Sequence, residues 1–368
     1  LAVTDSILVT GFPGLRARAV TAAVLAGDRD ARITLLVHPN RRADTEAALS
    51  AFLARERVTV LEGDAAAIDL GLAGAAFREL AETVRVVHHA YQVVDLDAPA
   101  EVARAVNVGG AREMIELGRA AKHLERLVVH SSVFVSGART GSVLESELAA
   151  GQTFRSPVEE SLALAEQMLS RHAALPLSIV RAPWVVGDSL TGEVDRLGGI
   201  YPLLVFLASA PRATALPLPP RSDGTLYAVP VDYVARAARI IAGHPGALKK
   251  TVHLVDTAAP TVQRFVEIVA ERLGQAIESS RNPAAFGRAL VRNPGVGLLA
   301  RKFRLVSDLV GTDAQYDNRN AVELLSPSRV ECPPLESYVD VMLEHVERRV
   351  AERRVAAPAS TEASHVAN

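Results

Sequence analysis

The chain has 368 residues, of which 49% are hydrophobic, and its 40 basic and 42 acidic side chains nearly cancel. This length can bury one large core or two moderate ones, while the charge balance and an aromatic content of only 4% argue against a nucleic-acid surface. The single cysteine, Cys332, excludes a disulfide framework and a thiolate metal cluster, and no apolar run is long enough to span a bilayer. We therefore expect a globular protein of a reducing cytoplasm, with no resident metal.

Short runs rich in β-branched residues alternate with amphipathic segments, which is the pattern of βαβ units. We predict strands at Ser6–Thr10, Arg32–Val37, Arg57–Glu62, Val84–His89, Leu124–His130, Leu177–Arg181 and Thr251–Val255. We predict helices at Leu15–Ala26, Ala43–Arg55, Gly71–Glu82, Ala100–Ala121 and Pro157–Ala173, and further helices near Asp232, Pro260 and Pro334. This order predicts an α/β fold with a doubly wound, mostly parallel sheet of the Rossmann type.

The turn between the first predicted strand and helix is rich in glycine, in the segment "ILVTGFPGLRARAV". The free amides at the start of a helix, together with its positive dipole end, can hold a pyrophosphate. Gly11 permits the turn, Gly14 permits close backbone approach, and Ala17 stands where a third glycine often sits. Its place directly after the first strand favours a dinucleotide-binding site over a purely structural turn.

The end of the second predicted strand reads "LLVHPNRRAD". Sites selective for NAD usually place a carboxylate there for the ribose hydroxyls, whereas this sequence offers Arg41 and Arg42, which could grip a 2′-phosphate. We therefore predict NADP rather than NAD. The alternative interpretation is a solvated loop whose arginines merely begin a helix.

Further motifs follow along the chain in a consistent order. They are "TGFPG" at 10–14, "EGD" ending at Asp64, "VVHHAY" at 86–91, Asn107, "HSSVFVSG" at 130–137, "IVRAPWVVGDSLTGE" at 179–193 and "VPVDYVA" at 229–235. In this order and spacing the chain resembles the extended short-chain dehydrogenases/reductases, closest to the branch of fatty acyl-CoA reductases and thioester reductase domains. The resemblance covers roughly residues 5 to 275 and implies a Rossmann fold with a reductase site.

The resemblance assigns the cofactor site to particular residues. Thr10, Gly11, Phe12, Pro13 and Gly14 would line the diphosphate. Asp64 would meet the adenine amino group and Ala90 would pack on the cofactor. From the residues alone, Asp64 can also be read as a turn former after a strand.

The resemblance also implies two catalytic roles. Asn107 would hold an active-site water from its helix, and Ser132, at the family's spacing before Gly137, would orient a substrate carbonyl. The alternatives are a helical asparagine that bonds locally and a hydroxyl that merely ends a strand.

The family's catalytic tyrosine and lysine, spaced Tyr-x-x-x-Lys, are missing. Counting forward from Ser132 and counting back from the pair Ala165-Glu166 both lead to Val158 and Leu162. In the family the lysine lowers the pKa of the tyrosine, which gives or takes the proton that accompanies the hydride. Valine and leucine can do neither, so the family's proton transfer is in doubt although its cofactor site is not.

Three kinds of substitute for the missing acid can be weighed. Tyr91 follows the fourth predicted strand and could act as an acid, and His130 titrates near neutrality but ends a buried strand. Glu159 and Glu160 lie beside Val158, where a helix-capping and a solvated role account for them more simply. Tyr91 is the substitute that we favour.

The C-terminal half is predicted to be looser. We divide the chain into an NADP-binding core at 1–186, a mixed, mainly helical substrate-binding region at 187–354 that returns a strand and helices to the core, and a disordered tail at 355–368. Between Arg281 and Ser307 the chain carries six basic residues and no acidic one. That segment could dock an acyl carrier, a coenzyme A phosphate or an anionic membrane, or be a solvated basic face.

The sequence favours an oxidoreductase that acts on an acyl thioester, aldehyde or ketone with hydride from NADPH. Ser132 would polarise the carbonyl, and the proton would come from water or a displaced donor. Two alternatives stay open: a catalytically inactive NADP-binding protein that serves as a sensor or scaffold, and a lyase or isomerase that reuses the fold without net redox chemistry.

Overall fold

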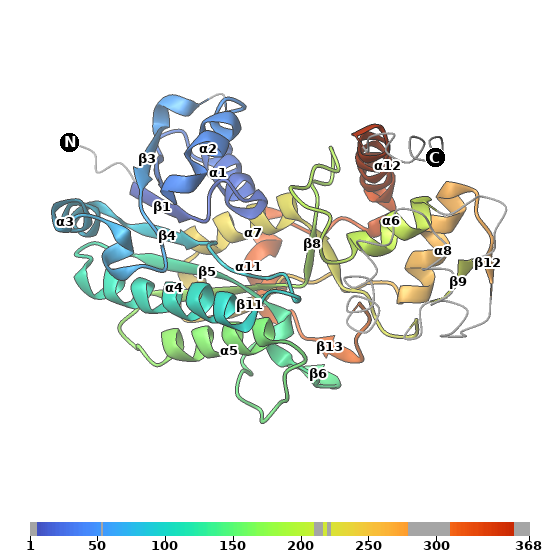
Figure 1. Ribbon diagram of the computed structural model, residues 1–368. Helices are drawn as coiled ribbons and strands as arrows, with labels where there is room; N and C mark the ends of the chain where they lie inside the picture. Colours follow the sequence, from blue (N-terminus) through green and yellow to red (C-terminus); the bar gives the residue numbers. More distant parts are fainter. Residues whose placement is uncertain (1–5, 53, 210–215, 219–221, 279–309, 357–368) are drawn as a thin grey trace, which may run out of the picture.

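The computed structural model describes residues 6–52, 54–209, 216–218, 222–278 and 310–356. At its centre lies a seven-stranded sheet in the order β11-β7-β5-β4-β1-β2-β3, and every neighbouring pair is parallel (Figure 1). The strands are β1 (Ser6–Thr10), β2 (Arg32–Val37), β3 (Val58–Glu62), β4 (Val86–His89), β5 (Arg126–Ser132), β7 (Leu177–Ala182) and β11 (Thr251–His253). The predicted doubly wound, parallel α/β sheet is confirmed.

Helices cover both faces of the sheet (Figure 1). One face packs against α1 (Leu15–Gly27), α2 (Arg42–Leu49), α7 (Val231–Gly243) and α11 (Arg319–Leu325), and the other against α3 (Gly74–Thr83), α4 (Ala100–Ala120) and α5 (Pro157–Ser170). The buried residues of α1 show why it lies on the sheet: Ala17, Val20, Thr21, Val24 and Leu25 recur at the spacing of one helical face.

Two predicted helices have different ends. The helix predicted to run to Arg55 ends at Leu49, because the Ser50 hydroxyl donates to the carbonyl of Ala47 and the turn tightens there. The helix predicted from Gly71 begins at Gly74. Before it, a short 3-10 turn at Ile68–Gly71 holds Asp69 and Leu70 at φ of 52° and 60°, which an α-helix does not accommodate.

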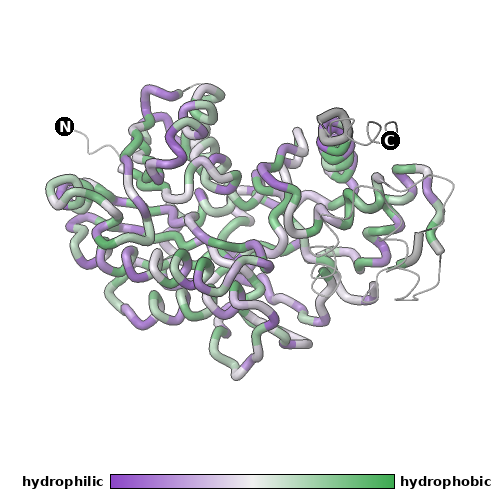
Figure 2. The backbone as a smooth tube through the Cα atoms, viewed as in Figure 1, coloured by the Kyte–Doolittle hydropathy of each residue, from purple (hydrophilic) through white to green (hydrophobic). Residues whose placement is uncertain are grey.

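A second group of elements lies beside the sheet. Helices α6 (Tyr201–Ser209), α8 (Val262–Leu273) and α12 (Val339–Ala356) pack together, and α6 is coloured mainly hydrophobic in Figure 2. Short parallel pairs join β8 (Trp184–Val186) to β10 (Ala228–Pro230), β6 (Gly141–Val143) to β13 (Ala314–Tyr316), and β9 (Leu216–Pro217) to β12 (Ile277–Glu278). The C-terminal half also returns β11, α7 and α11 to the sheet.

Some of the sequence-based expectations fall outside the described residues. These are the basic segment at 281–307 and residues 357–368 of the predicted tail. The first two residues of that tail, 355 and 356, are instead the end of α12 (Val339–Ala356). Within the described ranges, no helix combines the length and the apolar character needed to cross a membrane. The same ranges contain no cluster of three or more histidine, cysteine or acidic side chains suited to a metal ion.

A buried ion pair fixes α5 to the sheet. The Nη2 of Arg181, on β7, lies 2.7 Å from Oε2 of Glu166, on α5, and these side chains are only 2% and 1% exposed. Ser131, on β5, donates its hydroxyl to the same carboxylate, and Arg181 also donates to the carbonyl of Glu147 at 2.9 Å. The pair therefore ties one helix to two neighbouring strands.

The order of the strands determines where a ligand can bind. From β1 the chain moves outward to β2 and β3, and then returns to β4 on the other side of β1. At such a reversal the carboxyl ends of the two central strands border a crevice that the connecting helices leave open. Here the crevice lies between the turn after Thr10 and the loop after His89.

Candidate active site

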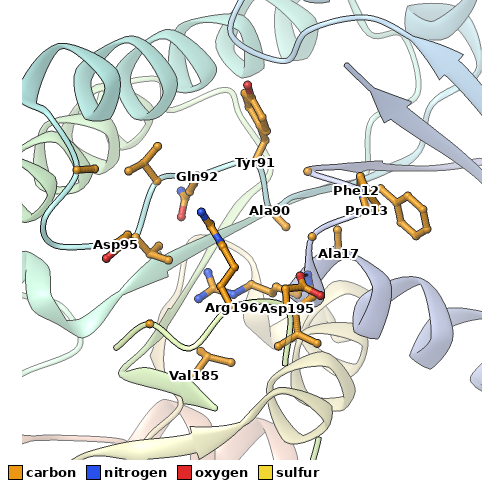
Figure 3. Close-up of a pocket in the computed structure, with 18 of the residues that line it drawn as sticks. Phe12, Pro13, Ala17, Ala90, Tyr91, Gln92, Asp95, Val185, Asp195 and Arg196 are labelled. Atoms are coloured by element: carbon orange, nitrogen blue, oxygen red, sulfur yellow. Dashed lines mark hydrogen bonds between the residues drawn. The ribbon is translucent and has the colours of Figure 1, made fainter. Parts of the chain in front are cut away.

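A cavity of about 510 Å³ opens at the carboxyl ends of β1 and β4 (Figure 3). Among the residues that line it are most of those predicted from the sequence: Gly11, Phe12, Pro13, Gly14, Arg41, Asp64, Ala90, Tyr91 and Ser132. Three predicted residues, Thr10, Arg42 and Asn107, are not part of the lining. The fold therefore brings residues that follow several different strands into one cleft.

The glycine turn sits directly against the loop after β4. Gly11 has φ of 90°, and a Cβ added there would lie 2.7 Å from the carbonyl oxygen of Ala90. Only glycine fits this conformation and this close approach. The turn is closed by a hydrogen bond of 2.9 Å from the Gly14 amide to the Gly11 carbonyl, and α1 begins at the next residue, Leu15. The arrangement leaves the first amides of α1 beside the cleft, as a dinucleotide site requires.

The side chain of Thr10 holds this turn in place through hydrogen bonds. It is fully buried, its hydroxyl lies 3.0 Å from Nδ1 of His89, and it accepts a hydrogen bond from the Tyr91 amide at 3.2 Å. These contacts hold the end of β1 to the end of β4. Thr10 thus shapes the cleft without facing it.

The two arginines after β2 differ in position. Arg41 lines the cleft, and its Nε donates to Asp44 at 2.8 Å in a largely exposed ion pair. Arg42 turns to the end of β3, where it pairs with Glu62. Between these neighbours, only Arg41 is placed to meet a ligand in the cleft.

Two residues that the sequence did not single out also line the cleft. His38, directly after β2, accepts a hydrogen bond from the Asn40 amide at 3.2 Å. Arg16, in the first turn of α1, has its pKa lowered to about 10 by burial and so stays positively charged at neutral pH. Their positions next to a strand end and a helix start were the available signals, but their side-chain directions depend on the fold.

Asp64 is bonded as a turn former and also lies in the wall of the cleft. Its Oδ1 accepts from the Ala66 amide at 3.0 Å, as in a turn, and its side chain also lines the cleft.

Burial, and then the charge of Asp64, raise the pKa of Tyr91. Figure 3 shows the Tyr91 ring pointing away from Asp195 and Val185. The phenol is therefore held protonated in the field of Asp64.

Ser132 lies at the end of β5 in an apolar part of the cleft. It is only 4% exposed, and its Oγ accepts from the Phe134 amide at 3.2 Å. Because the hydroxyl is the acceptor in that bond, its own hydrogen can be donated to a ligand. The rings of Phe134 and Trp184, with centroids 4.7 Å apart, form part of the neighbouring wall.

Asn107 is committed to the protein itself. Its Oδ1 accepts from the Val93 amide at 2.8 Å, and its Nδ2 donates to the Val93 carbonyl at 3.0 Å and to the Ser161 hydroxyl at 2.9 Å. The side chain is only 1% exposed. It joins α4 to the loop after β4 and to α5.

The positions of the missing tyrosine and lysine are filled by core packing. Val158 and Leu162 are 0% and 1% exposed and belong to the same hydrophobic cluster as Phe134 and Trp184. The helix that carries them begins as the sequence predicts, with the Ser156 hydroxyl accepting from the Glu159 amide at 3.3 Å. The α5 face at these positions is thus hydrocarbon, and neither residue lines the cleft.

The remaining candidate acids lie elsewhere. His130 is buried under the site, 3.4 Å from Nδ1 of His88, and its pKa is well below the usual range, first because of burial and then because of nearby positive charges. Glu159 is fully buried in an ion pair of 2.7 Å with Arg155, and Glu160 is exposed. None of these carboxylates or rings belongs to the cleft lining.

An acidic side chain reaches the start of α1 from far along the chain. The Leu15 amide donates to Oδ2 of Asp195 at 2.5 Å, across 180 residues of sequence. Arg18 holds the same carboxylate at 2.9 Å and also pairs with Glu193 at 3.0 Å. Figure 3 shows Asp195 beside Ala17, near the start of α1. No local pattern in the sequence signals this contact.

Comparisons with known proteins agree with this geometry. Residues 9–238 match the family model described as Male sterility protein. A linear gramicidin synthase of Brevibacillus parabrevis is 25% identical over 232 residues, which is 61% of this chain but only 4% of that protein. A glycine betaine reductase of Emericella nidulans is 27% identical over 229 residues, which is 61% of this chain and 18% of that protein. The chain thus spans only a small part of the length of both relatives.

Two solved structures share the fold. The terminal R domain from the myxalamid PKS-NRPS biosynthetic pathway has a TM-score of 0.80 at 23% identity, covering 94% of this chain and 91% of that one. A thiolation-reductase di-domain from an archaeal non-ribosomal peptide synthetase has a TM-score of 0.75 at 16% identity, covering 94% and 76%. The parallel sheet, its flanking helices and the C-terminal helical region are therefore an architecture that these reductase domains also have.

Proposed function

Because this chain belongs to the Male sterility protein family, within the extended short-chain dehydrogenases/reductases, we propose that it binds NADP(H) and reduces an acyl thioester to an aldehyde. One observation carries the proposal: Ser132 borders the cleft while the proton-relay positions, Val158 and Leu162, are hydrocarbon and buried. The site keeps a group that can polarise a carbonyl and lacks the family's group that delivers a proton.

The residues present fit a dinucleotide. Gly11 gives the close backbone approach, and the first turn of α1 offers its amides. Asp64 and Arg41 line the same cleft, and in our proposal they would meet the adenine amino group and the 2′-phosphate. When bound, NADPH supplies a hydride. The choice of NADP over NAD rests on Arg41 and on the absence of an acid at the end of β2.

The absence of the tyrosine and lysine that deliver the proton favours some carbonyl substrates over others. A thiol such as that of cysteine has a pKa of about 8.5, so a thiolate can leave without being protonated first. An alcohol, whose pKa is close to the value of about 15.7 for water, cannot form readily unless a positioned acid protonates the alkoxide. A site with Ser132 and with hydrocarbon at the relay positions therefore suits reduction of a thioester with loss of thiolate, and disfavours reduction of the aldehyde that results.

The thioester would be presented by coenzyme A or by a carrier protein. The name of the thiolation-reductase di-domain supports a carrier, since it joins a carrier module to a reductase of this fold. The basic segment at 281–307 is our proposed contact for the anionic carrier or coenzyme A.

In the test, the purified protein and NADPH are incubated with an acyl-coenzyme A thioester or with the free aldehyde of the same acyl group. We expect NADPH to be oxidised with the thioesters, and aldehyde to accumulate without alcohol. Ser132→Ala should lower this rate by about 10² to 10³, as loss of an oxyanion donor does. Ser136→Ala is the control, because Ser136 is a buried neighbour whose hydroxyl pairs with Tyr316 at 3.0 Å outside the cleft. Equal rates on aldehydes, or full activity in Ser132→Ala, would contradict the proposal.

A second candidate function is a catalytically inactive NADP-binding protein. The observation that favours it is that Asn107, Val158 and Leu162 are all committed to packing and internal hydrogen bonds. Tight NADPH binding with no turnover of any thioester would establish this second function and exclude the first.

A further inference from the structure

The segment after β8 contacts the start of α1 in an unusual way. Asp195 offers its carboxylate to the Leu15 amide at 2.5 Å, and that amide is the first of the helix that follows the glycine turn. A helix start after such a turn is where a dinucleotide diphosphate is held. A backbone amide has one hydrogen to donate, so a carboxylate and a phosphate cannot both receive it.

The carboxylate is held at that position by a second contact. Arg18, one turn further into α1, lies 2.9 Å from Asp195 and 3.0 Å from Glu193. The side chains of Glu193 and Asp195 are 63% and 32% exposed, and ion pairs of this kind are individually weak. Asp195 is thus attached firmly enough to compete for the amide, but not so firmly that it must stay.

The loop that leads to Asp195 is anchored to the rest of the protein. On its N-terminal side, Asp188 accepts from the amides of Leu190 and Thr191 at 2.9 and 3.1 Å, and Ser189 is bonded to Asp232 of α7. Gly192, at φ of 68°, is pressed against α12, because a Cβ there would lie 2.1 Å from the Val341 carbonyl. This anchored part therefore ends at a glycine.

Two further glycines follow the segment on its C-terminal side. Gly198 and Gly199 follow it directly, and Gly199 has φ of 58°. Residues 193–197 thus lie between glycines, with Val194 and Leu197 buried in the core. The side chain of Asp195, by contrast, is 32% exposed and lines the cleft.

We propose that the side chain of Asp195 is a latch, which takes the Leu15 amide in place of a cofactor phosphate and must turn away before a dinucleotide can bind. This inference rests on the proposed NADP(H) binding and adds a means of regulating it. Cofactor affinity is then reduced by the fraction of molecules in which the latch is closed.

The test compares the unmutated protein with Asp195→Ala and with Glu193→Gln. The second variant is a matched control, because it removes one negative charge from the same segment and leaves the contact with Leu15 in place. Each protein is titrated with NADPH and with adenosine 2′-monophosphate, which reaches the Arg41 and Asp64 end of the cleft but has no diphosphate. Thermal melting shows that the variants are folded.

We expect Asp195→Ala to bind NADPH about tenfold more tightly, and Glu193→Gln to show a much smaller change. Adenosine 2′-monophosphate should bind all three proteins equally. Unchanged or weaker NADPH binding by Asp195→Ala overturns the latch while the proposed function stands, and so does equal tightening of both ligands, which would be general electrostatics. If neither the unmutated protein nor Asp195→Ala binds any dinucleotide, the proposed function fails, and the latch fails with it.

Discussion

Asn107 and Ser161 are joined by a hydrogen bond of 2.9 Å, from the amide Nδ2 to the hydroxyl Oγ. Ser161 in turn donates to the carbonyl of Val158 at 2.9 Å, so Asn107 holds the turn of α5 in which the relay tyrosine of the family would stand. With its two bonds to Val93, the asparagine clamps α4, α5 and the loop after β4 together. From these bonds we predict that Asn107 contributes mainly to stability.

Asn107→Ala should therefore lower the free energy of unfolding by about 1–3 kcal/mol, because it leaves the backbone groups of Val93 without their partner. Denaturant unfolding measures the change. Ser161→Ala, which breaks only one of the three bonds, is the graded control and should lose less. A folded Asn107→Ala that kept its stability and lost thioester turnover would instead make Asn107 a catalytic residue.

The difference between Arg41 and Arg42 predicts the choice of cofactor. Arg41 lines the cleft and Arg42 pairs with Glu62, so Arg41→Ala should weaken NADPH binding roughly tenfold or more and leave NADH binding nearly unchanged. Arg42→Ala is the matched control and should keep the preference. Titration of each protein with both dinucleotides gives the ratio, and equal affinities in the unmutated protein would contradict the prediction.

Restoring the relay should extend the reaction. Val158→Tyr with Leu162→Lys places a phenol and an ammonium one helical turn apart, and we expect the double variant to carry aldehydes on to alcohols in an NADPH-dependent reaction. Each single change should do little, because the two groups act as a unit. Product analysis by chromatography distinguishes aldehyde from alcohol.

The same double variant carries a stability penalty, since both positions are buried and a larger or charged side chain must be accommodated. Val158→Phe with Leu162→Met supplies similar bulk without acid or cation and is the control for packing. A double variant that is folded, binds NADPH and still stops at the aldehyde would show that more than the relay has been lost.

Buried histidines predict a loss of stability in mild acid. Burial lowers the pKa values of His88 and His89 to about 4, against an ordinary value of 6.5. Between these values the unfolded chain binds more protons than the folded one, so the free energy of unfolding should fall as pH drops from about 6.5 towards 4. Denaturant midpoints measured across this range give the slope.

His89→Gln should make that slope shallower, whereas His123→Gln should not, because His123 is exposed. A slope that is the same in all three proteins would assign the acid sensitivity to other groups.

The fold follows from local patterns to a large extent. The strands and the helices of the nucleotide-binding part show periodicities that are short-range, and the apolar face of α1 alone places that helix on the sheet. The end of α2 at Leu49 did not follow, because Ser50 bonds back to the chain in a way that helix periodicity does not register. The positive φ of Asp69 and Leu70 likewise depends on tertiary contacts, among them a bond from the Asp69 amide to Glu113.

The same distinction applies to the candidate site: local sequence predicts some of its residues, whereas the positions of others depend on the fold. Gly11 and Ser132 lie next to strand ends, and the sequence of neighbours was enough to place them in the cleft. Arg42 could not be separated from Arg41, because the 3-10 turn at Pro39–Arg41 decides which side chain faces inward. Asp195 could not be found, since its partner is 180 residues away.

The Arg181–Glu166 pair has a consequence for how this site changes under substitution. Breaking such a buried pair typically costs about 3–5 kcal/mol, so α5 is anchored by residues that point into the sheet and away from the cleft. The orientation of the helix therefore does not rest on the buried side chains at 158 and 162 alone. Substitutions at 158 and 162 can therefore change the chemical groups that this helix carries while the Arg181–Glu166 pair still holds the helix to the sheet.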